Sequence, residues 1–448
     1  MSKKNKLMAL CVTVLCSQCL HAQPRVMSIG QLLTLADQNS VSLQAWRTQE
    51  AAAEEALKAA QAQRLPDISV SATASYWGNG HLWDRNFSNG SQIRMPHFGN
   101  NFALEAQQTV YAGGAVSSSI ELARLQKQMA TLERARNRQD VRFLMLGLYL
   151  NLYKQYNQLT VLRNHLKLTR QVLERMHARH EQGTALKNDI TRYELQQKQL
   201  QLQLTQTQNA CRIMNHQLST TLHLPEGTEI LPDTLLLDRQ IDSLHEKNWQ
   251  DTAAINHLGL QQAAAGIKIS EQQLRLERAA RRPQIALVAA DHLDGPITIE
   301  VPVLDNNFNY WYVGVSLRYS LSSLFKNKHK VQQARLGVTH AEEQYRLARE
   351  QVDNAVQENY VNFLTAFTDL QTQQKNVELA NESYRLVSHR YENELALLTD
   401  LLDAAHTKLN ADLSLADARI NLLYHYYKMK YVTHTLQECG GRTSPGLP

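Results

Sequence analysis

Polar and apolar residues alternate one for one in two stretches of the chain. Between residues 67 and 76, Ile68, Val70 and Tyr76 stand on one side, and aspartate, serine and threonine occupy the other. A two-residue period is typical of a β-strand with one apolar and one polar face. The second stretch has aromatic rings at both ends of an apolar side made of Trp311, Val313, Val315, Leu317 and Tyr319. Both stretches predict strands with a continuous apolar surface.

Long stretches without proline follow the predicted strands. Residues 115–182 carry a narrow apolar seam that repeats about every 3.5 positions, which is the spacing of a coiled coil. Residues 325–392 form a second stretch of this kind. At about 1.5 Å per residue, a helix of this length extends roughly 100 Å. Shorter single helices are predicted over residues 28–64 and 251–281. Because the apolar seams are narrow, the helices are expected to form rods that touch one another only sideways.

The second half of the chain repeats the first. With a shift of 211 positions, Arg179 falls on Arg390 and Asp189 on Asp400, and the match runs without a gap over about residues 121–221. So many matches at one offset indicate duplication of a structural unit. The first repeat is predicted to cover residues 23–222, with a strand hairpin at 66–112 and a helical tip near 183–189. The second is predicted to cover residues 250–438, with a strand hairpin at 283–323 and a tip near 393–400. Residues 223–249 link the repeats, and residues 439–448 form a tail.

The N-terminus has the pattern of a secretory signal peptide. Three lysines precede an apolar run over residues 7–15, and Ala22 ends a small-residue cleavage site. Residues 1–22 are therefore expected to be removed. Neither this run nor any later one reaches the roughly 18 apolar residues that a membrane-spanning helix needs. Cys16 and Cys19 leave a lipid-anchored N-terminus as an alternative.

The apolar strand faces indicate lipid as their surroundings, because such faces with aromatic rings at both ends are typical of a membrane barrel wall. Each chain offers only four strands, two per repeat, and four strands cannot close into a barrel. Since an open sheet edge is not tolerated in lipid, the strands are expected to pair with those of other chains. Two chains give eight strands and three give twelve. The predicted fold class is an α+β membrane protein, and the alternative is a soluble periplasmic coiled-coil interaction protein.

Charge and motifs argue against an enzyme. The formal net charge of +5 includes the three N-terminal lysines, so the mature chain is nearly neutral and gives no nucleic-acid signal. The sequence contains no phosphate-binding loop, His-Glu-x-x-His or Gly-x-Ser-x-Gly motif, and no cofactor is expected. His177 and His180 lie side by side before the first tip, but two ligands make an incomplete metal site. A disulfide between Cys211 and Cys439 is left open.

Four segments resemble the TolC family of outer-membrane efflux proteins. Residues 28–39 resemble the family's opening helix, and so do residues 59–70. At the two tips, residues 182–189 are similar to the family's Gly-Leu-x-x-x-x-Asp turn, and residues 398–404 to its Val-Asp-Val-Leu-Asp-Ala motif. Their order, together with the duplication, carries the resemblance over nearly the whole mature chain. The resemblance implies a homotrimer with a twelve-stranded barrel in the outer membrane, continued by a long periplasmic α-helical barrel.

The resemblance also implies partners and a passive role. A periplasmic adaptor (membrane fusion) protein and an inner-membrane pump of RND or ABC type would deliver cargo to the duct. Drug efflux, metal efflux and type I protein secretion are all compatible with the sequence.

The tips hold the candidate functional residues. Small or apolar residues at exposed turns are expected to contact the adaptor, namely Gly183, Ala185, Leu186, Leu397 and Leu398. Asp400 and Asp403 lie one helical turn apart, so threefold symmetry would stack them as two carboxylate rings at a gate. The resemblance adds a latch between Asp189 and Tyr391. Two departures from the family stand out: Glu394 replaces the glycine of the second tip, and Ala396 replaces a basic residue of some members.

Overall fold

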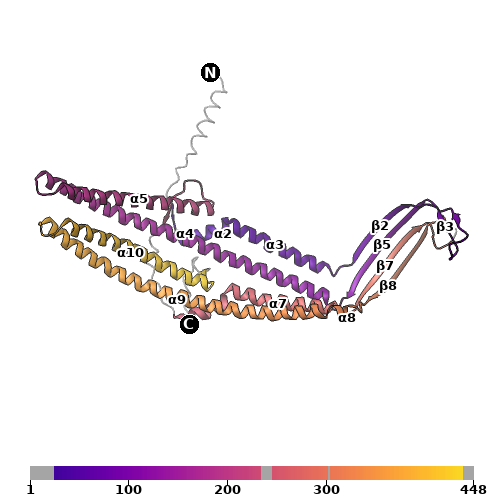
Figure 1. The fold of residues 1–448 in the computed structure, drawn as a ribbon. Coiled ribbons are helices and arrows are strands. Elements are labelled where there is room, and N and C mark those ends of the chain that lie inside the picture. Colours follow the sequence, from indigo (N-terminus) through magenta and orange to yellow (C-terminus); the bar gives the residue numbers. More distant parts are fainter. Residues whose placement is uncertain (1–24, 234–244, 301–302, 437–448) are drawn as a thin grey trace, which may run out of the picture. The chain divides into compact units, whose positions relative to one another are not determined.

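The structure is a computed structural model that describes residues 25–233, 245–300 and 303–436 (Figure 1). The chain divides into two compact units, each assembled from both halves of the sequence. The first comprises the described parts of residues 1–48, 132–260 and 347–448. The second comprises residues 49–131 and 261–346.

The second unit contains a four-stranded antiparallel sheet with the strand order β2-β5-β7-β8. Its strands are β2 (Asp67–Tyr76), β5 (Phe98–Tyr111), β7 (Gln284–Gly295) and β8 (Phe308–Arg318). Strands β2 and β8 form the two edges. A small hairpin of β3 (Gly80–Leu82) and β4 (Ser91–Ile93) lies in the connection between β2 and β5.

The register of the sheet joins the apolar sides of its strands into one face. Ile68, Ala106, Ala289 and Val313 follow one another across the four strands as directly opposed residues, whose side chains share a side of the sheet. This face is open to the surroundings of the chain, with Val70 79% and Trp311 73% exposed. The opposite face is mostly polar.

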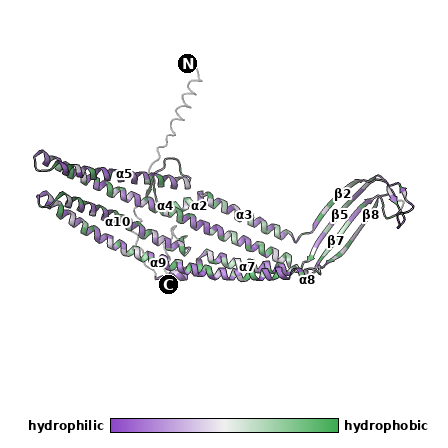
Figure 2. Ribbon diagram, in the orientation of Figure 1, coloured by the Kyte–Doolittle hydropathy of each residue, from purple (hydrophilic) through white to green (hydrophobic). Residues whose placement is uncertain are grey.

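Long helices make up most of the remaining structure. The first repeat contributes α2 (Ile29–Asn39), α3 (Val41–Ala62), α4 (Ala115–Glu181) and α5 (Lys187–Thr221). The second contributes α6 (Glu246–Asn256), α7 (Leu258–Ala279), α8 (Ser323–Lys326), α9 (Lys328–Glu392) and α10 (Leu398–Val432). Figure 2 shows hydrophilic and hydrophobic residues interleaved along the long helices, as expected for helices that bury only a narrow seam.

Both shorter helices of the sequence prediction are broken in two. The predicted helix over residues 28–64 is interrupted at Ser40, and the one over residues 251–281 at His257, where the backbone becomes extended. The two breaks lie 217 positions apart, so they occupy the same place in the two repeats. At the first break, serine is a poor interior residue but a good helix N-cap, a signal that the Ala- and Gln-rich surroundings obscured.

The core of the first unit forms around the middle of α4. Tyr149 is fully buried, and its hydroxyl donates to the carbonyl oxygen of Met27. Met27 belongs to β1 (Arg25–Met27), which pairs in parallel with β6 (Ile230–Pro232). The segment between the repeats, predicted only as a linker, therefore contributes a strand to this core.

An ion-pair cluster fixes α2 against α4 in the same unit. The carboxylate of Asp37 accepts hydrogen bonds from the guanidinium groups of both Arg138 and Arg142, and Arg142 is buried. Burial alone would raise the pKa of Asp37, but the hydrogen bonds and positive charges of the two arginines together outweigh burial and hold this pKa below its ordinary value of 3.8. The ionised carboxylate is the form that stabilises the fold.

Replacing Asp37 with asparagine should therefore destabilise the protein. Asp37→Asn leaves two partly buried guanidinium groups without a counter-charge, and we expect a loss of about 2 kcal/mol. Because the folded-state pKa is lowered, the wild-type stabilisation is present above pH 3.8 and is lost as the pH falls through the folded-state value. Thermal unfolding followed by circular dichroism at pH 7 and at pH 3 measures both effects.

The matched control is Glu55→Gln, which removes the exposed pair between Glu55 and Lys58. It should leave the melting temperature unchanged, because exposed ion pairs contribute little. Equal melting temperatures for Asp37→Asn and wild type at pH 7 would contradict the role of this cluster.

Candidate functional site

The two helical tips share one backbone conformation. The N–H of Thr184 donates to the carbonyl of Arg179 at 2.9 Å, and the N–H of Leu395 donates to that of Arg390 at 2.7 Å. These bonds close the helix C-terminus around a residue in the left-handed region. That residue is Gly183, with φ +77°, in the first tip. In the second tip it is Glu394, with φ +62°.

Glu394 adopts a conformation that favours glycine and forms an ion pair there. A side chain in the left-handed region costs roughly 1–2 kcal/mol. The carboxylate of Glu394 accepts from the guanidinium of Arg179 at 2.9 Å, and that of Glu392 accepts from Arg175. We call Arg175, Arg179, Glu392 and Glu394 the tip clasp, because its two ion pairs join α4 to the second tip.

Beneath the tip clasp, a small apolar core packs the two hairpins together. It is a cluster of buried residues from all four helices: Val172, Leu173, Met176, Ile190, Tyr193, Tyr384, Leu398, Leu401 and Ala404. Leu398 is only 6% exposed, whereas Leu186 and Leu397 are each 70% exposed. Of the five residues predicted to contact an adaptor, Leu398 thus has a packing role within the chain. Gly183, Leu186 and Leu397 are exposed, and Ala185 is half-buried.

The acidic residues of the predicted gate have different surroundings. One carboxylate oxygen of Asp400 accepts from the backbone N–H of Leu397 at 3.1 Å, so this side chain caps α10. Asp403 is exposed one turn further along, and Asp189 is half-buried in the first turn of α5.

Tyr391 lies between the two hairpins. The guanidinium of Arg179 is 5.9 Å from the centre of the Tyr391 ring. Burial raises the pKa of the Tyr391 phenol, and the negative charge of Asp189 raises it further. The phenol is therefore protonated at neutral pH and can donate a hydrogen bond.

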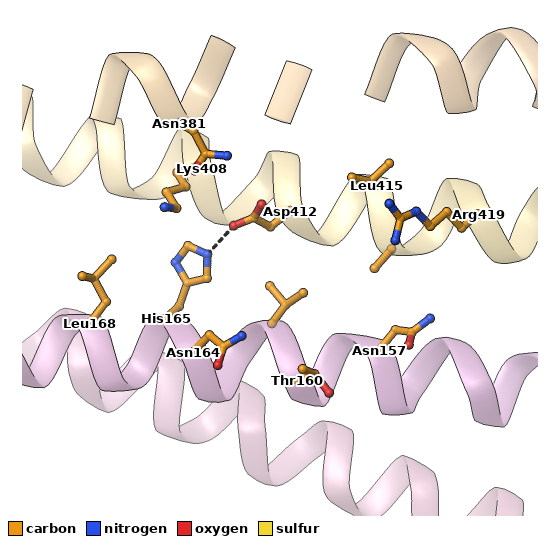
Figure 3. A pocket seen from close by; sticks show the side chains of 12 residues that line it. Asn157, Thr160, Asn164, His165, Leu168, Asn381, Lys408, Asp412, Leu415 and Arg419 are labelled. Carbon is orange, nitrogen blue, oxygen red and sulfur yellow. Dashed lines mark hydrogen bonds and ion pairs between the residues drawn. The ribbon is translucent and has the colours of Figure 1, made fainter. Parts of the chain in front are cut away.

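Polar pairs also hold α4 against α10 away from the tips. His165 contacts the carboxylate of Asp412 at 2.8 Å, and Lys154 contacts that of Asp417 at 3.0 Å. Figure 3 shows His165 and Asp412 facing one another between the two helices. The pair lines an open cavity of about 510 Å³ together with Lys408 and Arg419. Sequence reasoning missed this seam, because the duplication does not reveal which helices of the two repeats are neighbours.

The two histidines near the first tip do not converge. His180 is bonded through Nδ1 to the carbonyl of Ala185, and His177 lies 3.9 Å from the carboxylate of Glu194. Across the described residues, no group of three or more His, Cys, Asp or Glu side chains is arranged to hold a metal ion. Cys211 is buried, and Cys439 lies outside the described residues.

None of the helices in the described residues combines the length and the apolar character needed to cross a bilayer.

Solved structures with this fold include outer-membrane channels. VceC from Vibrio cholerae is 16% identical, with a TM-score of 0.74 over 92% of this chain and 96% of that chain. CusC is 13% identical, with a TM-score of 0.78 over 90% and 91%. MtrE from Neisseria gonorrhoeae, solved in an open state, is 17% identical, with a TM-score of 0.66 over 92% and 91%.

The model of the outer membrane efflux protein family matches residues 32–222 and 249–426, one segment in each repeat. The chain belongs to this family. A search of curated proteins finds no significant match. Family and fold confirm the predicted fold class, the internal duplication and the outer-membrane location with a large periplasmic helical part. They also confirm that the chain is a channel component rather than an enzyme.

Proposed function

We propose that this chain is the outer-membrane duct of a tripartite efflux or export system and that it works as a homotrimer. The observation that carries this proposal is the four-stranded sheet. Among the described residues, its two edge strands, β2 and β8, have no neighbour on their outer side within the sheet, and one face of the sheet is apolar. In lipid, the backbone groups of both edges need partners. Pairing β8 of one chain with β2 of the next closes the sheet, and three chains supply twelve strands.

The apolar face of each strand would then meet lipid, and the polar face would line water. The lipid-facing set comprises Ile68, Val70, Tyr76, Trp311, Val313, Val315, Leu317 and Tyr319, all of which are exposed in the single chain. Strands of 10 to 14 residues are long enough to cross a bilayer at a tilt.

Helices α4 and α9, with 67 and 65 residues, would extend the duct into the periplasm. There an adaptor protein and an inner-membrane pump of RND or ABC type would engage it, and the pump would supply the energy. Which pump engages the duct decides whether the cargo is a drug, a metal ion or a secreted protein.

At the tips, the exposed residues Gly183, Leu186 and Leu397 and the half-buried Ala185 would form the adaptor contact. Apolar side chains on an exposed turn give up no strong interaction with water when a partner binds. Their burial against the partner is favourable because it removes apolar surface from water.

The same end would act as a gate. Tyr391 and Asp189 would form a latch between the hairpins, and the tip clasp would strengthen it in place of the basic residue missing at Ala396. Threefold symmetry would place Asp400 and Asp403 as carboxylate rings at the narrowing, where they favour cations. Because Asp400 also caps α10, Asp403 is the cleaner residue with which to test the rings.

The first prediction of this proposal is a trimer in detergent extracts of outer membranes. Light scattering corrected for detergent should give about 150 kDa, three times the 51 kDa of the chain less the signal peptide. A monodisperse monomer that is soluble without detergent would rule the duct out and favour the periplasmic coiled-coil alternative.

Charged substitutions at the tips should abolish adaptor binding without affecting assembly. Leu186→Glu and Leu397→Glu place carboxylates in the apolar contact, so the adaptor should no longer copurify from detergent-solubilised cells. Leu195→Glu, at a leucine that is 60% exposed on α5 away from the tip, is the control and should retain the adaptor. Full adaptor recovery with both tip variants would place the contact elsewhere.

Reversing one charge of the tip clasp should open the gate. Arg179→Glu and Glu394→Arg each leave two like charges facing one another, and each should raise single-channel conductance in planar bilayers severalfold. The double variant restores an opposite-charge pair and should return conductance toward wild type, which a general loss of structure would not do.

In the same recordings, Tyr391→Phe should raise conductance by removing the phenol donor. Asp403→Asn should weaken cation selectivity. If conductance and selectivity are unchanged in all these variants, the tips are not the gate.

A further inference from the structure

A row of aromatic rings lies on the polar face of the sheet. Contact with lipid does not explain these rings, because lipid would meet the opposite, apolar face. The imidazole of His292 on β7 stacks on Tyr310 of β8 with ring centres 5.1 Å apart, and Tyr310 is 5.4 Å from Phe308. The ring centre of Tyr312 is 6.2 Å from that of His292, and the two rings are nearly parallel. We call Phe308, Tyr310, Tyr312 and His292 the ring ladder.

The ring ladder belongs to the loop end of the sheet. Strand β7 ends at Gly295 and β8 begins at Phe308, whereas the helices join the opposite ends of these strands. In a trimeric duct the ladder would therefore line the outer end of the channel.

A carboxylate is held at the ladder. Asp294 accepts hydrogen bonds from the side-chain amide of Asn101 and from the Tyr310 hydroxyl at 3.3 Å. Asn101 lies directly opposite Asp294 on the neighbouring strand β5. Three strands thus cooperate to fix one negative charge beside the rings.

Sheet stability alone gives a weak reason for this arrangement. Cross-strand ring pairs contribute only weakly to the stability of a sheet. The rings remain open to water in the chain, with Tyr310 38%, Tyr312 47% and Phe308 54% exposed. On β2, the same face carries small polar residues instead of rings, such as Ser71 and Thr73.

We propose that the ring ladder and Asp294 form a transit site for organic cations that carry aromatic groups. The inference rests on the proposed function, because only the closed trimer makes the polar face a channel lining. The carboxylate would attract the positive charge, and the ring faces would stack on the cargo and interact with its cation.

The strength of such a site suits a duct. An exposed cation–π contact and an exposed ion pair each contribute only weakly to binding. Three symmetry-related copies raise the local concentration of a cation without holding it tightly. Conduction needs this balance, since cargo must enter a site and also leave it.

Block of single channels by tetraphenylphosphonium added to the extracellular side tests the proposal. Tetrabutylammonium, a cation of the same charge without rings, is the comparison compound. Wild-type channels should be blocked at about tenfold lower concentrations of the aromatic cation. Tyr310→Leu combined with Tyr312→Leu should remove this preference, because leucine keeps the side chains apolar but removes the rings.

Asp294→Asn should weaken block by both cations at least fivefold while preserving a bond to Asn101. The matched control is Asp291→Asn, which removes a carboxylate from the same strand but on the opposite face, where Asp291 is bonded to Asn309. That variant should be blocked like wild type.

Equal block by the two cations in wild type, or equal effects of Asp294→Asn and Asp291→Asn, would overturn the transit site. Channels that conduct normally in those experiments would leave the duct itself intact. If wild-type protein forms no channels at all, it is the proposed function that fails.

Discussion

Backbone hydrogen bonding at the sheet edges governs the rest of this structure. Strands β2 and β8 present rows of N–H and C=O groups at opposite edges of a sheet with one apolar face. Such a face belongs in lipid, yet lipid offers no partner to a backbone group, so an isolated chain cannot satisfy both demands. The proposed association with copies of itself would satisfy both demands at once. The polar face would then line a channel, and the helices that continue from the strands would extend that channel.

Duplication provides two similar helical hairpins. The residues at their tips differ, and this difference allows an ion pair to form between the two hairpins. Arg179 and Arg390 occupy equivalent positions, but they act differently. Arg390 donates to the carbonyl of Leu395 within its own tip, whereas Arg179 reaches across to Glu394. The reach is useful because Glu394 stands in the second tip where the first tip has Gly183. The backbone strain at Glu394 is a local cost that an ion pair between hairpins offsets, which links the second tip to the first through a contact that can be broken.

Local patterns predicted most of the fold. The two-residue period gave the strands of residues 67–76 and 308–318, and the absence of proline gave α4 and α9 to within a few residues. The breaks at Ser40 and His257 were missed, because helix propensity stays high on both sides of each break. The tip clasp and the α4–α10 seam were missed for another reason. Arg179 and Glu394 are 215 positions apart, and no sequence period says that their helices are neighbours.

The ring ladder was missed because the two sides of one strand can carry different residue patterns with different roles. The alternation of Trp311, Val313 and Val315 in β8 predicts a lipid-facing side. That pattern contains no information about what Tyr310 and Tyr312, on the other side of the strand, contact. Only the register, which sets His292 opposite Tyr310 and Asn101 opposite Asp294, shows that these side chains form a cluster. A channel lining needs polar groups for water but has no need of aromatic rings. Rings that face water beside a fixed carboxylate therefore call for an explanation in terms of what passes through the channel.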